Sequence, residues 1–319
     1  MTSPLLAAAT VLRRRSRWQT AALCVVLLCA AYLGRRHWPV LESGADQLAG
    51  ADQGWLLAGA AAAVATWACS ALAQQGSVAE RLPGGRLLAA QFAASAANHV
   101  LPAGLGAGAV NLRFLMRCGL SAGRSASALA VKAAAGALAR AALIAVLAAA
   151  CPGVLRLPHV SAPTVAAVLA ALLAAAVLPA VLLRGPLRAR CGRAVCSVLA
   201  DIRAVHTRPH RAAALWGGSL AFATAHALVV IAVTQAVGLP LSPARVALLY
   251  LAASSAAALL PTPGGIGSLD AALAFALTTA GAPGASAASA VMGYRLLTVW
   301  APLLPGLLVL GFLIRRRAV

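Results

Sequence analysis

Three charged side chains lie deep inside apolar stretches of this chain: Arg140, Asp270 and Arg295. A charged group at the centre of a bilayer costs about 2.5–3.5 kcal/mol on insertion scales, so it is normally buried, paired and functional. Arginine binds phosphate through a planar fork of N–H donors. We expect the two arginines to bind an anionic group and Asp270 to hold or release an arginine. Asp270 also follows a helix break closely enough to cap the helix that begins there.

Other kinds of chemistry find little support in the sequence. There is no G-x-x-x-x-G-K-[ST] motif for nucleotide phosphates, and no Ser/His/Asp order or carboxylate pair suggests hydrolysis. The seven cysteines form no C-x-x-C pair, and Pro209 interrupts the histidine pair at His206 and His210. His226 stands alone in an apolar stretch, where a histidine is more often packed and hydrogen-bonded than a ligand. We therefore expect no catalytic residues, no cofactor and no metal, and the protein is predicted not to be an enzyme.

The segment around Asp270 has a partner earlier in the chain. At an offset of 159 residues, AASAANHVLPAGLGAGAVN (93–111) aligns with AASSAAALLPTPGGIGSLD (252–270), with eight of nineteen positions identical. Pro102 then aligns with Pro261, and Asn111 with Asp270. A single Pro/Gly break could be a kink between packed helices. Two matched breaks favour a duplicated unit that builds a polar site, because a membrane helix tolerates a break only where the freed backbone is satisfied.

The composition indicates which elements must position these residues. The chain has 319 residues, of which 62% are hydrophobic and only 10% charged, with a mean hydropathy of +0.88; soluble domains carry about 25% charged residues. Stretches of roughly 20 apolar residues can cross a bilayer. We predict six spans, at 18–34, 54–73, 125–150, 161–183, 212–237 and 285–314. The two broken regions, 87–117 and 243–281, are predicted to be re-entrant hairpins.

The distribution of basic residues predicts the orientation. The net charge is +20, but no soluble domain carries it, so binding of nucleic acid is not favoured. With a cytoplasmic N-terminus, 19 of the 26 basic residues face inward, including seven in the loop 184–211. Both termini are then cytoplasmic, in a cell-membrane protein. Three full spans separate the two hairpins, so the halves (about 1–155 and 156–319) form an inverted repeat within one transmembrane domain.

Three motifs carry a resemblance to a known family. The first is N-x-x-x-P with a later arginine, at Asn98, Pro102 and Arg113. The second, P-x-P-G-G-x-G-x-x-[DE], comprises Pro261, Pro263, Gly264, Gly265, Gly267 and Asp270. The third is the pair Tyr294–Arg295 in the last span. Together they resemble the flippase-like integral membrane family typified by the transmembrane region of lysylphosphatidylglycerol synthases. That family commonly has an aspartate closely after the arginine equivalent to Arg140, and this chain has none.

The resemblance implies lipid flipping, or membrane partnership with envelope-synthesis enzymes. We predict an all-α polytopic membrane protein that moves an anionic phospholipid or a lipid-linked envelope intermediate between leaflets. The alternative is a membrane scaffold that partners a glycosyltransferase or another envelope-synthesis enzyme. The predicted translocation path comprises Asn98, Pro102, Asn111, Arg113, Arg140, Pro261, Pro263, Gly264, Gly265, Gly267, Asp270, Tyr294 and Arg295.

Overall fold

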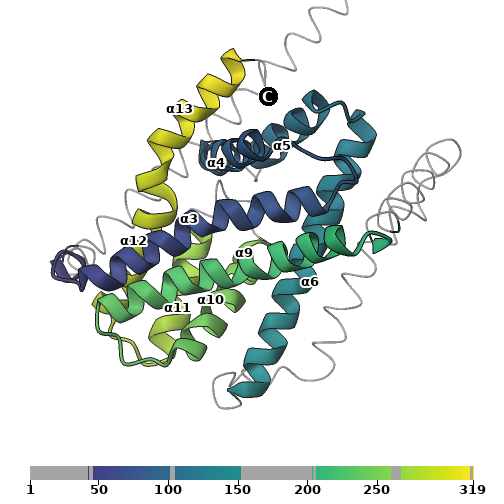
Figure 1. Ribbon diagram of the computed structural model, residues 1–319. Coiled ribbons are helices and arrows are strands. Elements are labelled where there is room, and N and C mark those ends of the chain that lie inside the picture. Colours follow the sequence, from purple (N-terminus) through teal and green to yellow (C-terminus); the bar gives the residue numbers. More distant parts are fainter. Residues whose placement is uncertain are drawn as a thin grey trace, which may run out of the picture.

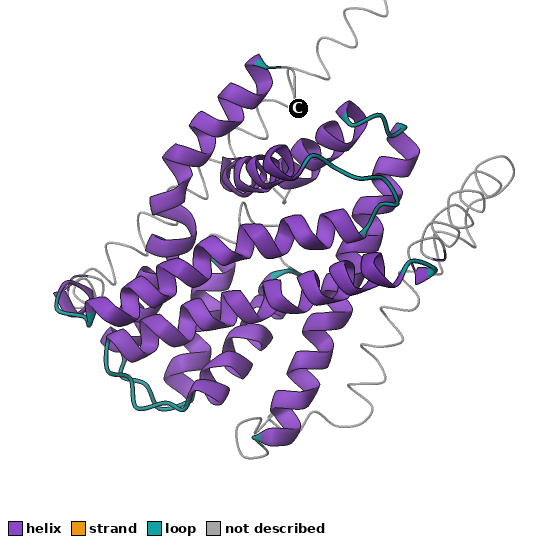
Figure 2. Ribbon diagram, viewed as in Figure 1, coloured by secondary structure: helices purple, strands orange, loops and turns teal. Residues whose placement is uncertain are grey.

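The computed structural model describes residues 42, 46–100, 105–151, 203, 206–259, 267–316 and 319. Helices and short connections make up this part of the chain (Figure 2). The predicted spans 18–34 and 161–183 lie outside the described residues, as does most of the loop 184–211. The same holds for the residues predicted at the tips of the two breaks: Pro102, Pro261, Pro263, Gly264 and Gly265.

Four helices are long and apolar enough to cross a membrane. They are α3 (Gln53–Gly76), α6 (Ala122–Ala150), α9 (Pro209–Ala236) and a composite helix over Gly284–Arg315. The composite helix consists of α12 (Gly284–Arg295), a π-helical turn η3 (Leu296–Trp300) and α13 (Ala301–Arg315). These four long helices correspond to the predicted spans 54–73, 125–150, 212–237 and 285–314, so the protein is a multi-pass membrane protein.

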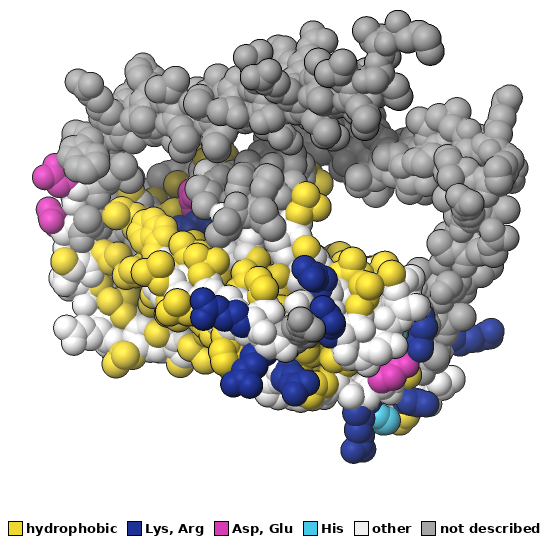
Figure 3. Space-filling model, turned by 90° about the horizontal axis from the view of Figure 1, so that it is seen from above, with side chains coloured by type: hydrophobic (Ala, Val, Ile, Leu, Met, Phe, Trp, Pro, Cys, Tyr) yellow, Lys and Arg dark blue, Asp and Glu magenta, His cyan; other side chains and the backbone are white. Residues whose placement is uncertain are grey.

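The outer surfaces of these helices are apolar. Leu57 of α3 is 72% exposed and Leu308 of α13 is 76% exposed. On the face drawn in Figure 3, hydrophobic side chains form a broad area, and basic side chains lie beside it. Large exposed apolar areas are normal for helices that contact lipid.

Each broken region forms two short helices that pack against one another. The first contains α4 (Gly84–Val100) and α5 (Leu105–Arg117), and the second α10 (Pro243–Ala257) and α11 (Ser268–Thr279). At 1.5 Å per residue, helices of 12 to 17 residues extend about 18–26 Å, less than a hydrocarbon core of roughly 30 Å. Gly106 lets α5 approach α4 closely, because a Cβ there would lie 2.0 Å from the Ala97 carbonyl oxygen.

An antiparallel pair, α3 and α9, forms the centre of the fold (Figure 1). The Asp52 N–H, at the start of α3, donates to the Ala236 carbonyl at the end of α9 (3.0 Å). At the other end, a Cβ on Gly76 would lie 2.2 Å from the Leu215 nitrogen. Small residues let membrane helices pack this closely through van der Waals contact.

The order and packing of the helices recur in the second half of the chain. When 159 is added to its residue number, the start of α4 coincides with the start of α10. By the same shift, α3, α5 and α6 begin within a few residues of the starts of α9, α11 and α12. Corresponding pairs are in contact: α3 with α4 and α9 with α10, α5 with α6 and α11 with α12. Each hairpin also packs on the last long helix of the other half, α4 on α13 and α10 on α6. In Figure 1 the two hairpins lie on opposite sides of the α3–α9 pair.

Candidate functional site

Two adjoining cavities lie among these helices. The first has a volume of about 310 Å³ and lies between α3, α4, α5, α9 and the η3 region. The second, of about 820 Å³, follows α6 and also touches α5, α9 and α10. The walls of both cavities include Ser70, Ala107, Asn111, Lys132 and Phe222. Residues from both halves of the chain therefore line two cavities that share part of their walls.

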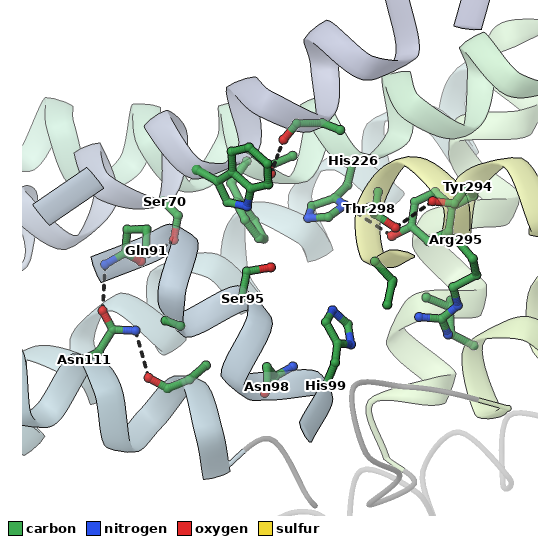
Figure 4. Close-up of a pocket in the computed structure, with 18 of the residues that line it drawn as sticks. Ser70, Gln91, Ser95, Asn98, His99, Asn111, His226, Tyr294, Arg295 and Thr298 are labelled. Carbon is green, nitrogen blue, oxygen red and sulfur yellow. Dashed lines mark hydrogen bonds between the residues drawn. The ribbon is translucent and has the colours of Figure 1, made fainter. Parts of the chain in front are cut away.

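A hydrogen-bonded cluster stands where the two cavities meet. Lys132 of α6 donates to the Ser70 hydroxyl and to the Gln91 carbonyl oxygen, both at 3.0 Å. The Ser70 hydroxyl donates to that same Gln91 oxygen (2.8 Å), and the Gln91 amide donates to the Asn111 oxygen (2.6 Å). The Asn111 amide in turn donates to the Ala107 carbonyl (2.9 Å), as Figure 4 shows. Four helices, α3 to α6, thus position one ammonium group against neutral acceptors.

An ion pair forms the corresponding feature of the second half. The Asp270 carboxylate, in the first turn of α11, accepts from the Arg295 Nε at 2.5 Å. Its other oxygen accepts from the Gly267 N–H (2.8 Å), so Asp270 also caps α11. Gly267 has a φ of 85°, which a glycine adopts at little cost. The Arg295 side chain is only 6% exposed and lines the first cavity. The pairing of Asp270 with an arginine and its capping role therefore coexist.

Aromatic side chains extend this second site. The hydroxyls of Tyr250 and Tyr294 are 2.9 Å apart, and the Tyr294 hydroxyl lies 3.2 Å from His226 Nδ1. Tyr294 and His226 both line the first cavity (Figure 4). The prediction that His226 is packed and hydrogen-bonded agrees with this contact.

The cavity walls are basic. Lys132 and Arg295 line the first cavity, and Lys132 and Arg140 line the second. Neither wall includes an aspartate or glutamate among the described residues. Asp270 reaches Arg295, and Glu80 is engaged elsewhere with Arg124 at 2.7 Å. The walls therefore carry more positive than negative charge, which favours an anionic occupant.

The structure brings together some of the predicted path residues. Asn98, Asn111, Tyr294 and Arg295 line the first cavity. Arg140 lines the second, so it does not share a wall with Arg295 as a joint phosphate clamp would require. Arg113 is exposed on α5 and lines neither cavity.

Three residues of the site escaped the sequence-based selection: Ser70, Gln91 and Lys132. Lys132 had a usable signal, because it is the single lysine beside 25 arginines and lies within a predicted span. Ser70 and Gln91 had none, since uncharged polar residues occur on many faces of membrane helices. In the described part of the chain, no cluster of three or more His, Cys, Asp or Glu residues is arranged to hold a metal.

The chain matches a known family of membrane regions. The sequence profile described as "Lysylphosphatidylglycerol synthase TM region" matches residues 20–306, nearly the whole chain. A search of curated proteins finds no match.

Proposed function

Because the chain belongs to the family of lysylphosphatidylglycerol synthase transmembrane regions, we propose that it is a flippase for an anionic phospholipid or a lipid-linked envelope intermediate. The family itself indicates a membrane protein that handles phospholipids. Our proposal goes one step further than the family does, because it has the lipid move between leaflets. This movement involves no covalent chemistry.

A single observation carries this proposal: a basic cavity enclosed by both hairpins. Asn98 and Asn111 of the first hairpin line the first cavity together with Leu269 of the second. Ala107 of the first hairpin and Ser255 of the second line the second cavity. A lipid headgroup that crosses a bilayer needs such a polar route, whereas a passive anchor needs none.

The repeat supports a route that can open to either side. In our proposal the two halves form an inverted repeat, with the hairpins entering the membrane from opposite sides. The antiparallel α3–α9 pair and the exchanged packing of the hairpins support this arrangement. We place both termini in the cytoplasm, where the positive-inside distribution of arginines puts them.

The ion pair supports a mechanism of exchange. A phosphate that enters the first cavity competes with Asp270 for Arg295, whose side chain faces that cavity. When the phosphate leaves, Asp270 pairs with the arginine again, so the guanidinium is never left without a partner in a low-dielectric environment. The acyl chains stay in the bilayer throughout.

The rival proposal is a scaffold that docks an envelope-synthesis enzyme. Transport in the absence of any partner separates the two. We would reconstitute the purified protein into liposomes that contain fluorescent phosphatidylglycerol and follow its accessibility to a membrane-impermeant quencher. The expected result is faster exchange between leaflets than in protein-free liposomes. The variant Arg295→Met, which lacks the guanidinium, should exchange lipid more slowly than the wild type. Equal rates with and without protein would overturn the flippase proposal.

A further inference from the structure

One face of α6 carries small residues together with two basic residues, Lys132 and Arg140. Lys132, Ala133, Gly136, Ala137, Arg140 and Ala141 all line the second cavity. Their spacing of three and four residues places them on a single stripe of the helix. The stripe begins at the polar cluster shared by the two cavities and runs toward the C-terminal end of α6.

The small side chains leave this stripe open. A Cβ added at Gly136 would meet no atom of the described residues within 4 Å. Ala133, Ala137 and Ala141 are exposed and also line the cavity, so the second cavity is a groove open along its side. Ser219 of α9 and Ser255 of α10 supply hydroxyls on the facing walls.

Both cations on the stripe lack a carboxylate partner in the described part of the chain. Lys132 donates to neutral oxygens of Ser70 and Gln91, which leaves one of its three N–H donors. Among the described residues, no hydrogen bond or ion pair engages Arg140. Positive groups so placed attract a phosphate more strongly than they would in water, because the surroundings have a low dielectric constant.

From these observations we infer that the phosphate of an anionic phospholipid travels along this face of α6, with Lys132 and Arg140 as successive binding stations. The two positions are eight residues apart, or about 12 Å along the helix axis. The small residues between them give the headgroup room, and the open side of the groove lets the acyl chains remain in lipid. This inference rests on the proposed flippase function, and it adds the route and the order of contacts.

The first test closes the groove without touching a cation. Gly136→Leu places a bulky side chain between the stations and is expected to slow transport of phosphatidylglycerol at least tenfold. Gly136→Ala adds only a Cβ, which the space accommodates, so it is expected to slow transport much less than Gly136→Leu. Ala134→Leu adds the same bulk at an exposed position of α6 that does not line the groove, and it should transport normally. An equal rate for Gly136→Leu and Ala134→Leu would overturn the route.

The second test measures binding and separates the sources of phosphate. Native mass spectrometry in detergent would compare phosphatidylglycerol with phosphatidylcholine and with inorganic phosphate. We expect preferential binding of phosphatidylglycerol, reduced about tenfold in Lys132→Met and in Arg140→Met. Binding of inorganic phosphate with the same preference would overturn a lipid occupant, and equal lipid binding by wild type and both variants would overturn the stations.

The two proposals fail in different ways. If the wild type transports lipid and Gly136→Leu does so equally well, the route along α6 is wrong and the flippase function stands. If the wild type transports nothing, the flippase function is wrong. The binding measurement then decides whether Lys132 and Arg140 still bind phospholipid.

Discussion

Each half of this protein has a polar residue at an equivalent position, but the two residues belong to different kinds of site. Asn111 in α5 belongs to a chain of neutral acceptors that ends at the Lys132 ammonium. Asp270, 159 residues later in α11, forms an ion pair with Arg295. The first site holds its lysine against neutral acceptors, whereas the second pairs its arginine with a carboxylate. Similar helix arrangements therefore hold a cation against neutral acceptors where Asn111 stands and in an ion pair where Asp270 stands.

The difference extends to the first helix of each hairpin. Gln91 in α4 and Tyr250 in α10 occupy equivalent positions at the same offset. Gln91 binds the lysine and the asparagine, whereas the Tyr250 hydroxyl contacts Tyr294. The first site thus supports its cation with side-chain amides, and the second packs aromatic rings beside its arginine. We expect the first site to bind a headgroup and the second to respond to it.

Removal of the carboxylate should have the largest effect. Asp270→Ala removes the carboxylate that pairs with the buried Arg295 guanidinium and is expected to cost about 3–5 kcal/mol of stability. The neutral counterpart, Asn111→Ala, leaves the Gln91 amide without its acceptor and should cost about 1–3 kcal/mol. Thermal unfolding of the detergent-solubilised protein measures both. Equal losses would contradict the distinction between a charged and a neutral site.

Neutralising Asp270 without shortening it should separate transport from folding. In Asp270→Asn the amide oxygen can still accept from the Gly267 N–H, but the charge is lost. We expect transport to fall about tenfold, or roughly 1.4 kcal/mol, because Arg295 then holds the phosphate without a competitor. The amount of folded protein should change much less. A parallel loss of protein and activity would assign Asp270 to helix capping alone.

The reciprocal change should close the first site. Asn111→Asp places a carboxylate next to Gln91, which binds Lys132. We expect binding of phosphatidylglycerol to weaken about fivefold, or roughly 1 kcal/mol, since the positive charge is then partly compensated. Binding of phosphatidylcholine serves as the control and should not change. Tighter phosphatidylglycerol binding would show that the lysine is not the attracting group.

The smallest effect is expected where the second site loses a neutral hydrogen bond. Tyr250→Phe removes the hydroxyl contact with Tyr294 and keeps the ring, so it should cost about 0.5–1.5 kcal/mol of stability. The midpoint of thermal unfolding measures this loss, and transport should remain near the wild-type rate. A large fall in transport would place Tyr250 on the headgroup route and contradict a purely supporting role for its hydroxyl.

Several features of the fold were predictable because they depend on residues close together in the chain. The described spans followed from hydropathy, and the two interruptions from Pro and Gly at matched positions. The equivalence of Asn111 and Asp270 followed from the repeat itself. That Asp270 caps α11 also followed from its place in the first turn.

The sequence by itself determined that this is a helical membrane protein with two broken units and charged residues inside its apolar stretches. Only the tertiary structure decided which polar groups meet. Lys132 is 62 residues from Ser70 and 41 from Gln91, and Arg295 is 25 from Asp270. Hydropathy and helix propensity are local properties, so they identify a span without its neighbours. The partners of a side chain depend on how each helix is rotated and packed against the others, and that packing separated Arg140 from Arg295 and left Lys132 facing both cavities.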